Sequence, residues 1–103
     1  MIGGVNVKVR EITTNELIRY CNAYDDEQTH KELELILIAV KAYIKNYTGV
    51  DEETLNEYED VTLAVLVLVN EMYDNRSYST NMTVNVLNPI VESILNMHRI
   101  NLL

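Results

Sequence analysis

The chain has 103 residues, 48% of them hydrophobic, which excludes a disordered chain and favours one small folded domain. Its formal net charge of −8, from 16 acidic and 8 basic residues, excludes a protein that grips nucleic acid through a basic face. The single cysteine, Cys21, excludes an intrachain disulfide and fits a reduced, cytosolic setting, and no apolar run is long enough to span a membrane.

The chain begins with a segment that predicts an extended arm, because valines alternate with polar residues over residues 5–12. A short helix is expected next. Thr13 can cap its first turn, and Glu16 stands three residues later, where the second member of a capping box belongs. This helix is expected to end at about Asn22.

The longest predicted helix covers about residues 28–47, and an apolar stripe recurs along it at helical spacing. Leu35, Ile38 and Ala42 widen that stripe, so more than one face of the helix is apolar. Gly49 stands where a left-handed residue commonly ends a helix.

Six acidic residues fall within residues 51–60 and predict a solvated turn, in which Asp51 can start one helical turn. A calcium loop is excluded because no alternating ligands flank a central glycine. The apolar run Val61–Val69 continues without a break to about Asn75, so its length favours a helix capped by Asp60 over a buried strand. A helix that is apolar on nearly every side needs cover on nearly every side, and we expect another subunit to supply part of it.

The last third of the chain begins with a polar segment in which residues 82–86 alternate again, as in a short β-hairpin or an extended loop. Asn88 and Pro89 then supply the cap and the first residue of a last helix, which is expected to end at Arg99. Residues 100–103 form an apolar tail that an isolated monomer would leave exposed.

These elements predict an all-α fold. We expect a small four-helix bundle over residues 13–99, an extended N-terminal arm over residues 1–12 and an apolar C-terminal tail over residues 100–103.

The residues that could carry chemistry lack partners in the sequence, so we expect no enzyme, no cofactor and no metal site. Cys21 falls on the apolar face of a helix and is expected to be a buried thiol. His30 and His98 lack the spacing of metal ligands and are expected to be ordinary surface histidines. Arg76 and Arg99 stand at helix ends, where they either stabilise the helix dipole or pair with acidic residues of a neighbouring subunit.

The order of these parts resembles the head–tail connector family of tailed bacteriophages and prophages, also called head-completion or adaptor proteins. The resemblance covers about residues 13–99. It rests on a capped first helix, a long second helix, an apolar helix and a proline-started last helix. The residues that carry it are Asp25-Asp26, Tyr43 to Gly49, Met72 to Arg76, Pro89 and Arg99. The arm before residue 13 and the Asn-Pro pair depart from the family pattern.

This resemblance implies a structural virion protein that is made in the bacterial host cytoplasm and sits at the head–tail junction. In that family a ring of identical subunits docks beneath the portal, extends the DNA channel and receives a tail-side stopper or completion protein. DNA passes through without sequence-specific binding, which strong negative charge suits. The expected contacts to a neighbouring subunit or the portal involve Tyr73, Arg76, Arg99, Ile100, Leu102 and Leu103.

Two hypotheses about contacts accompany this interpretation. The alternating residues 5–12 and 82–86 could pair as strands, within or between subunits, and the tail 100–103 could dock onto the portal. An acidic inhibitor or DNA mimic that binds a basic partner is the alternative function, and the net charge favours it. A helical antitoxin-like module lacks the tail that would wrap a toxin.

Overall fold

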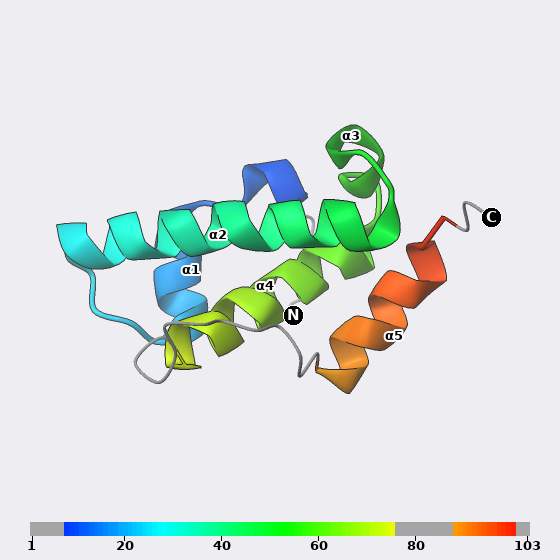
Figure 1. Cartoon of the computed structure of the whole chain (residues 1–103). Helices are drawn as coiled ribbons and strands as arrows, with labels where there is room; N and C mark the ends of the chain where they lie inside the picture. The colour runs from blue at the N-terminus through cyan, green and yellow to red at the C-terminus, as the bar shows by residue number, and fades with distance from the viewer. Residues whose placement is uncertain (1–7, 76–87, 101–103) are drawn as a thin grey trace.

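The computed structural model describes residues 8–75 and 88–100, and all the regular structure in these ranges is helical. The predicted all-α fold is confirmed. Figure 1 shows α4 running beneath α2, with α5 towards one end of this pair and α1 towards the other. The elements are η1 (Val9–Glu11), α1 (Thr14–Cys21), α2 (Glu27–Thr48), α3 (Glu52–Leu55), α4 (Glu59–Asn75) and α5 (Pro89–His98).

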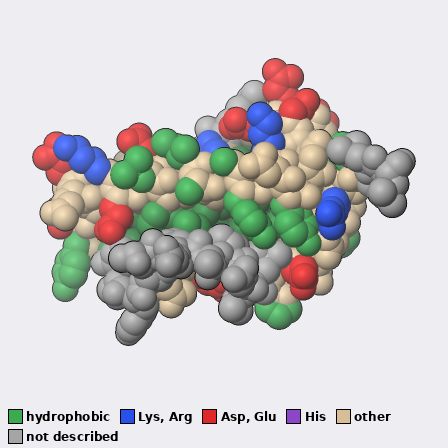
Figure 2. Space-filling model, in the orientation of Figure 1, with side chains coloured by type: hydrophobic (Ala, Val, Ile, Leu, Met, Phe, Trp, Pro, Cys, Tyr) green, Lys and Arg blue, Asp and Glu red, His purple; other side chains and the backbone are tan. Residues whose placement is uncertain are grey.

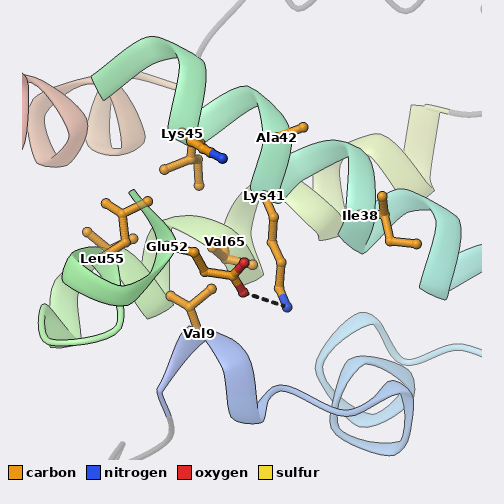
Figure 3. Close-up of a pocket in the computed structure, with 10 residues that line it drawn as sticks. Val9, Ile38, Lys41, Ala42, Lys45, Glu52, Leu55 and Val65 are labelled. Atoms are coloured by element: carbon orange, nitrogen blue, oxygen red, sulfur yellow. Dashed lines mark ion pairs between the residues drawn. The ribbon is translucent and has the colours of Figure 1, made fainter. Parts of the chain in front are cut away.

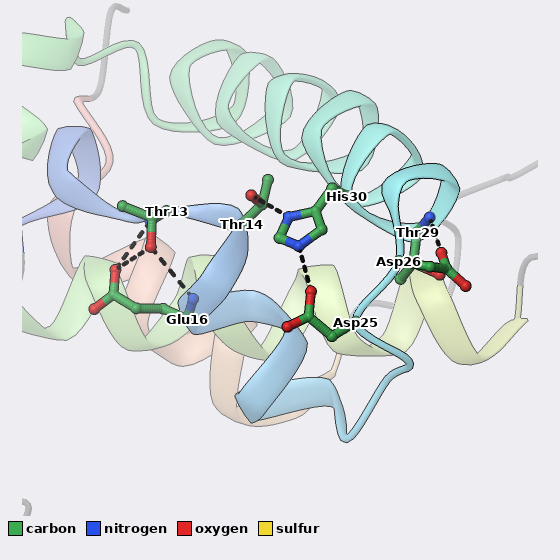
Figure 4. Close-up of polar contacts among 7 residues, drawn as sticks. All are labelled: Thr13, Thr14, Glu16, Asp25, Asp26, Thr29 and His30. Atoms are coloured by element: carbon green, nitrogen blue, oxygen red, sulfur yellow. Dashed lines mark hydrogen bonds and ion pairs between the residues drawn. The ribbon is translucent and has the colours of Figure 1, made fainter.

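Side-chain caps begin the first two α-helices. The Glu16 N–H donates to the Thr13 hydroxyl at 3.3 Å and the Thr13 N–H donates to the Glu16 carboxylate at 2.9 Å, so the predicted capping box is confirmed. At the start of α2, Asp26 accepts the Thr29 N–H at 2.7 Å (Figure 4). This hydrogen bond holds the pKa of Asp26 below its usual value.

Short-range signals also set the remaining ends. Gly49 ends α2 with φ 74°, in the left-handed region predicted for it. Asp51 accepts the Thr54 N–H at 2.8 Å and starts α3, the single helical turn foreseen as an option, which adds a fifth α-helix to the expected four. Asn88 accepts the Ile90 N–H at 2.8 Å, and proline occupies the first turn of α5 as predicted.

The N-terminal arm differs from the expectation. The prediction of an extended segment up to residue 12 is wrong for Val9–Glu11, because these residues form one 3-10 turn. Val9 and Ile12 are three residues apart, so this turn directs both side chains to one side, where both are buried. The Lys8 N–H donates to the Glu11 carboxylate at 3.1 Å and closes the turn. Residues 1–7 and the second alternating segment, 82–86, lie outside the described residues.

The core is built around α4, which packs against α1, α2, α5 and η1. Its predicted helical state over Val61–Val69 is confirmed, but the helix begins at Glu59, so Asp60 lies in the first turn and is not the N-cap. Val61 and Val69 have no exposed surface, and Leu63 is the large apolar side chain of α4 that remains most exposed. Most of the cover for α4 therefore comes from the same chain.

We expect Leu95→Ala to lower the free energy of unfolding by about 2–5 kcal/mol, because Leu95 of α5 is fully buried and its loss leaves a cavity. Met97→Ala is the control on the same helix, since Met97 is exposed, and it should change the value by less than about 0.5 kcal/mol. Urea unfolding followed by circular dichroism measures both. Equal effects of the two substitutions would contradict the docking of α5 on α4.

Candidate functional site

One end of the molecule joins the C-terminal end of α2 to the end of α5. The Tyr47 hydroxyl donates to the Asn96 side chain at 2.9 Å, and the Arg99 guanidinium carbon lies 5.1 Å from the centre of the Tyr47 ring. The Ile100 N–H donates to the Thr48 carbonyl at 2.8 Å. The end of α2 and the end of α5 therefore meet here.

A second contact fixes the end of α5 to the start of α4. His98 Nε2 lies 2.9 Å from both carboxylate oxygens of Asp60, and the His98 ring stacks on Tyr58 with centroids 4.0 Å apart. His98 is half-buried, so the expectation of an ordinary surface histidine is wrong for it. The Asp60 carboxylate therefore contacts His98 of α5 and does not cap its own helix, α4.

His30 likewise has partners that the sequence did not reveal. Its Nδ1 lies 2.7 Å from the Thr14 hydroxyl and its Nε2 lies 2.7 Å from Asp25, so the ring ties the start of α2 to the start of α1 (Figure 4). The expectation of a surface histidine is wrong here too, because His30 is half-buried. The described residues contain no group of three or more side chains that could hold a metal ion.

Cys21 is buried, as predicted, at the end of α1. Burial raises the pKa of its thiol to about 11, and the nearby Asp74 carboxylate adds to the rise. The thiolate is the reactive form, so this environment makes Cys21 inert as a nucleophile.

Two helices present apolar side chains to solvent. On α5 the exposed fractions are 63% for Ile90 and 73% for Met97, two turns apart on one face. On α2 they are 68% for Leu35 and 59% for Ile38. Figure 2 shows hydrophobic side chains along the outer side of α2, with charged side chains of both signs beside them. Exposed apolar faces of this kind are typical of protein–protein contact sites.

The outer face of α2 borders an open groove of about 370 Å³ between η1, α2, α3 and α4. Apolar side chains form most of its lining, including Val9, Ile38 and Leu55 (Figure 3). The Lys41 ammonium lies 3.7 Å from the Glu52 carboxylate and forms an ion pair across the groove. The polar part of the lining is formed by Lys41, Lys45 and Glu52.

The structure describes three of the six residues predicted to contact a neighbouring subunit or the portal: Tyr73, Arg99 and Ile100. Arg99 and Ile100 lie together at the junction with α2, and both are exposed. Tyr73 is 8% exposed and belongs to the core, so it does not join them on the surface. Arg76, Leu102 and Leu103 lie outside the described residues.

The outer face of α2 was missed as a site, although its signal was present in the sequence. Leu35, Ile38 and Ala42 form a second apolar stripe beside the buried one. Periodicity alone does not distinguish a stripe covered by the same chain from one left open.

Comparison with known protein families, with curated proteins and with solved structures finds no match for this chain. Among the helices described, none is both long and apolar enough to cross a membrane.

We expect the Asp60–His98 pair to show a coupling energy of about 1 kcal/mol in a double-mutant cycle, because both groups are partly buried and in direct contact. The cycle uses Asp60→Ala, His98→Ala and the double variant, with urea unfolding as the readout. The exposed Glu27–Lys31 pair, 3.9 Å apart, is the control and should couple by less than about 0.5 kcal/mol. Additive single effects at Asp60 and His98 would contradict the contact.

The raised pKa of Cys21 predicts slow thiol chemistry in the folded state. A pKa of about 11 in place of 9.0 lowers the thiolate fraction at pH 8 about 100-fold. Labelling with a thiol-reactive aromatic disulfide should therefore be at least 100-fold slower in native protein than in urea, as followed by absorbance. Similar rates in both states would show that Cys21 is accessible and ionised.

Proposed function

We propose that this chain is a structural protein of a tailed bacteriophage or prophage virion, which forms a ring between the portal and the tail-side proteins. In this role it extends the DNA channel at the head–tail junction and performs no catalysis. The ring is homo-oligomeric, and its tail-side neighbour is a stopper or completion protein. The proposal rests on the sequence resemblance over about residues 13–99.

The observation that carries the proposal furthest is the junction between α2 and α5. The resemblance was drawn from the segment Tyr43–Gly49 and from Arg99, far apart in the sequence. In the folded chain Tyr47 contacts Arg99, and Thr48 binds Ile100. A motif whose distant parts meet is more specific than the same parts scattered over the surface. The junction also presents Arg99 and Ile100 together at one end of the molecule, where a neighbour could bind them.

The exposed apolar faces support assembly with other copies or other proteins. A closed ring uses two different surfaces of each subunit, because each subunit contacts a neighbour on either side. The faces of α2 and α5 are separate apolar surfaces on one small chain. The net charge of −8 suits a channel wall that repels DNA and lets it slide.

The net charge equally favours the alternative, an acidic inhibitor that mimics DNA. The roles of individual carboxylates oppose it. Asp26 and Asp51 cap helices, and Asp25 and Asp60 bind histidines. Carboxylates engaged in separate local contacts do not form a continuous stripe with the spacing of phosphates.

Co-purification with the portal protein encoded by the same phage or prophage tests the proposal. We expect the full chain to bind the portal at low and moderate salt, and negative-stain images to show an added ring of density beneath it. A chain truncated after Arg99 should bind more weakly, because the apolar residues 100–103 are expected to contact the portal. Arg19→Ala is a matched control, since Arg19 is exposed on α1, far in sequence from the junction.

Absence of binding at both salt concentrations would overturn the connector proposal and leave the acidic inhibitor. That alternative predicts a complex with a basic protein that weakens steeply as salt is added. Full binding by the truncated chain would remove the portal contact of the tail and leave the connector role intact.

A further inference from the structure

The outer face of α2 carries large apolar side chains in its first half and small ones in its second half. Four exposed residues occupy the spacing of one helix face: Leu35, Ile38, Ala39 and Ala42. The two large side chains come first and the two small ones follow. The midpoint of the four falls between Ile38 and Ala39.

Two opposite charges flank this midpoint along one edge of the face. Glu34 precedes it and Lys45 follows it, and both are exposed. They are about three turns of 3.6 residues apart, so they lie along the same edge of the helix. Lys41, on this edge as well, is already paired with Glu52 of the same chain across the groove (Figure 3). Lys31, on the same side of α2, is likewise paired with Glu27 at 3.9 Å. Hydrogen bonds from Thr54 lower the pKa of the nearby Asp51, and Lys45 adds to this lowering. Among the described charges of this edge, Glu34 and Lys45 are therefore the two that no ion pair within the chain holds.

We propose that the outer face of α2 binds the same face of a second copy of this chain, with the two helices antiparallel about a two-fold axis. In this arrangement Leu35 packs on Ala42 of the second copy and Ile38 packs on Ala39 of the second copy. Each contact places a large side chain against a small one, which lets two helices approach closely and interdigitate. Glu34 then lies two residues, about 3 Å along the helix axis, from the level of Lys45 of the second copy, within reach of the long lysine side chain, and the symmetry makes this ion pair twice.

Other arrangements of the two helices fit the pattern less well. A parallel two-fold pair would oppose large side chains to large ones, and it would place the Glu34–Lys45 edges of the two copies on opposite sides of the seam, where the ion pairs could not form. The antiparallel pair removes both conflicts. The charge pattern is thus complementary to a reversed copy of itself, which is the requirement for a two-fold interface.

The dimer is expected to be weak. A standard interface covers about 800 Å² of each partner, and one helix face with two large apolar side chains covers less. We therefore expect a dissociation constant of roughly 10–100 μM. The inference does not depend on the ring proposal, because it follows from α2 alone. A two-fold dimer would also occupy the α2 face and so keep it from any other contact.

Sedimentation equilibrium of the full chain across this concentration range tests the dimer. Glu34→Lys and Lys45→Glu should each weaken self-association roughly tenfold or more, because each turns two attractions into two repulsions. Mixing the two variants in equal amounts should restore the dimer, since each 34–45 pair in the mixed dimer joins opposite charges. The double variant carrying both changes should also dimerise. Circular dichroism checks that every variant keeps its helical content.

The control variant is Glu92→Lys, which makes the same charge change on exposed α5 and should leave the α2 dimer unaffected. Leu35→Asp should abolish the dimer, because it places a carboxylate at the apolar contact. A wild-type chain that stays monomeric, or single variants whose mixture associates no better than either alone, would overturn the proposal. A larger ring that is indifferent to all these changes would also overturn it while supporting the connector role.

Discussion

The need to enclose α4 is the constraint on which the rest of the structure depends. Its side chains are apolar around nearly the whole helix, and Val61, Val65 and Val69 have at most 1% of their surface exposed. Water is excluded from such a helix only when neighbours cover it on several sides. Helices α1, α2 and α5 and the turn η1 each supply one side. The polar contacts then fix these neighbours in place, as His98 does when it binds Asp60 at the start of α4.

The long helix α2 covers one side of α4 but is longer than that cover requires. Its 22 residues extend about 33 Å at 1.5 Å per residue, longer than the 17 residues of α4 beneath it. The buried stripe of α2 packs against α4 and includes Leu33, Val40 and Ile44. The second stripe, with Leu35 and Ile38, stays mostly exposed beside that core. Exposed apolar faces of this kind are typical of contact sites with other proteins.

Local signals predicted most of the fold, and tertiary contacts account for what was missed. The capping box of Thr13, the left-handed Gly49 and the Asn88-Pro89 start act within one turn of chain, so the sequence displays them directly. The alternating valines of the arm predicted an extended segment, which is wrong for Val9–Glu11. Val9 and Ile12 are three residues apart, and a 3-10 turn lets both side chains reach the core. His98 and Asp60 are 38 residues apart, and no local pattern links them. Of the expected contact residues, Arg99 and Ile100 reached a shared surface because α5 docks beside the end of α2, whereas Tyr73 turned inward with the apolar side of α4.

A single face cannot serve two interfaces at once, and this gives the α2 dimer a consequence for assembly. If the subunits of a ring touch through α2, the two-fold dimer must open before the ring closes. A weak dimer opens readily, and a portal that holds many subunits at high local concentration would favour ring contacts over pairs in solution. If the ring instead uses α5 and the junction at Tyr47, the α2 faces stay free for the two-fold contact. The proposed α2 dimer therefore competes with a ring built through α2 and is compatible with a ring built through α5.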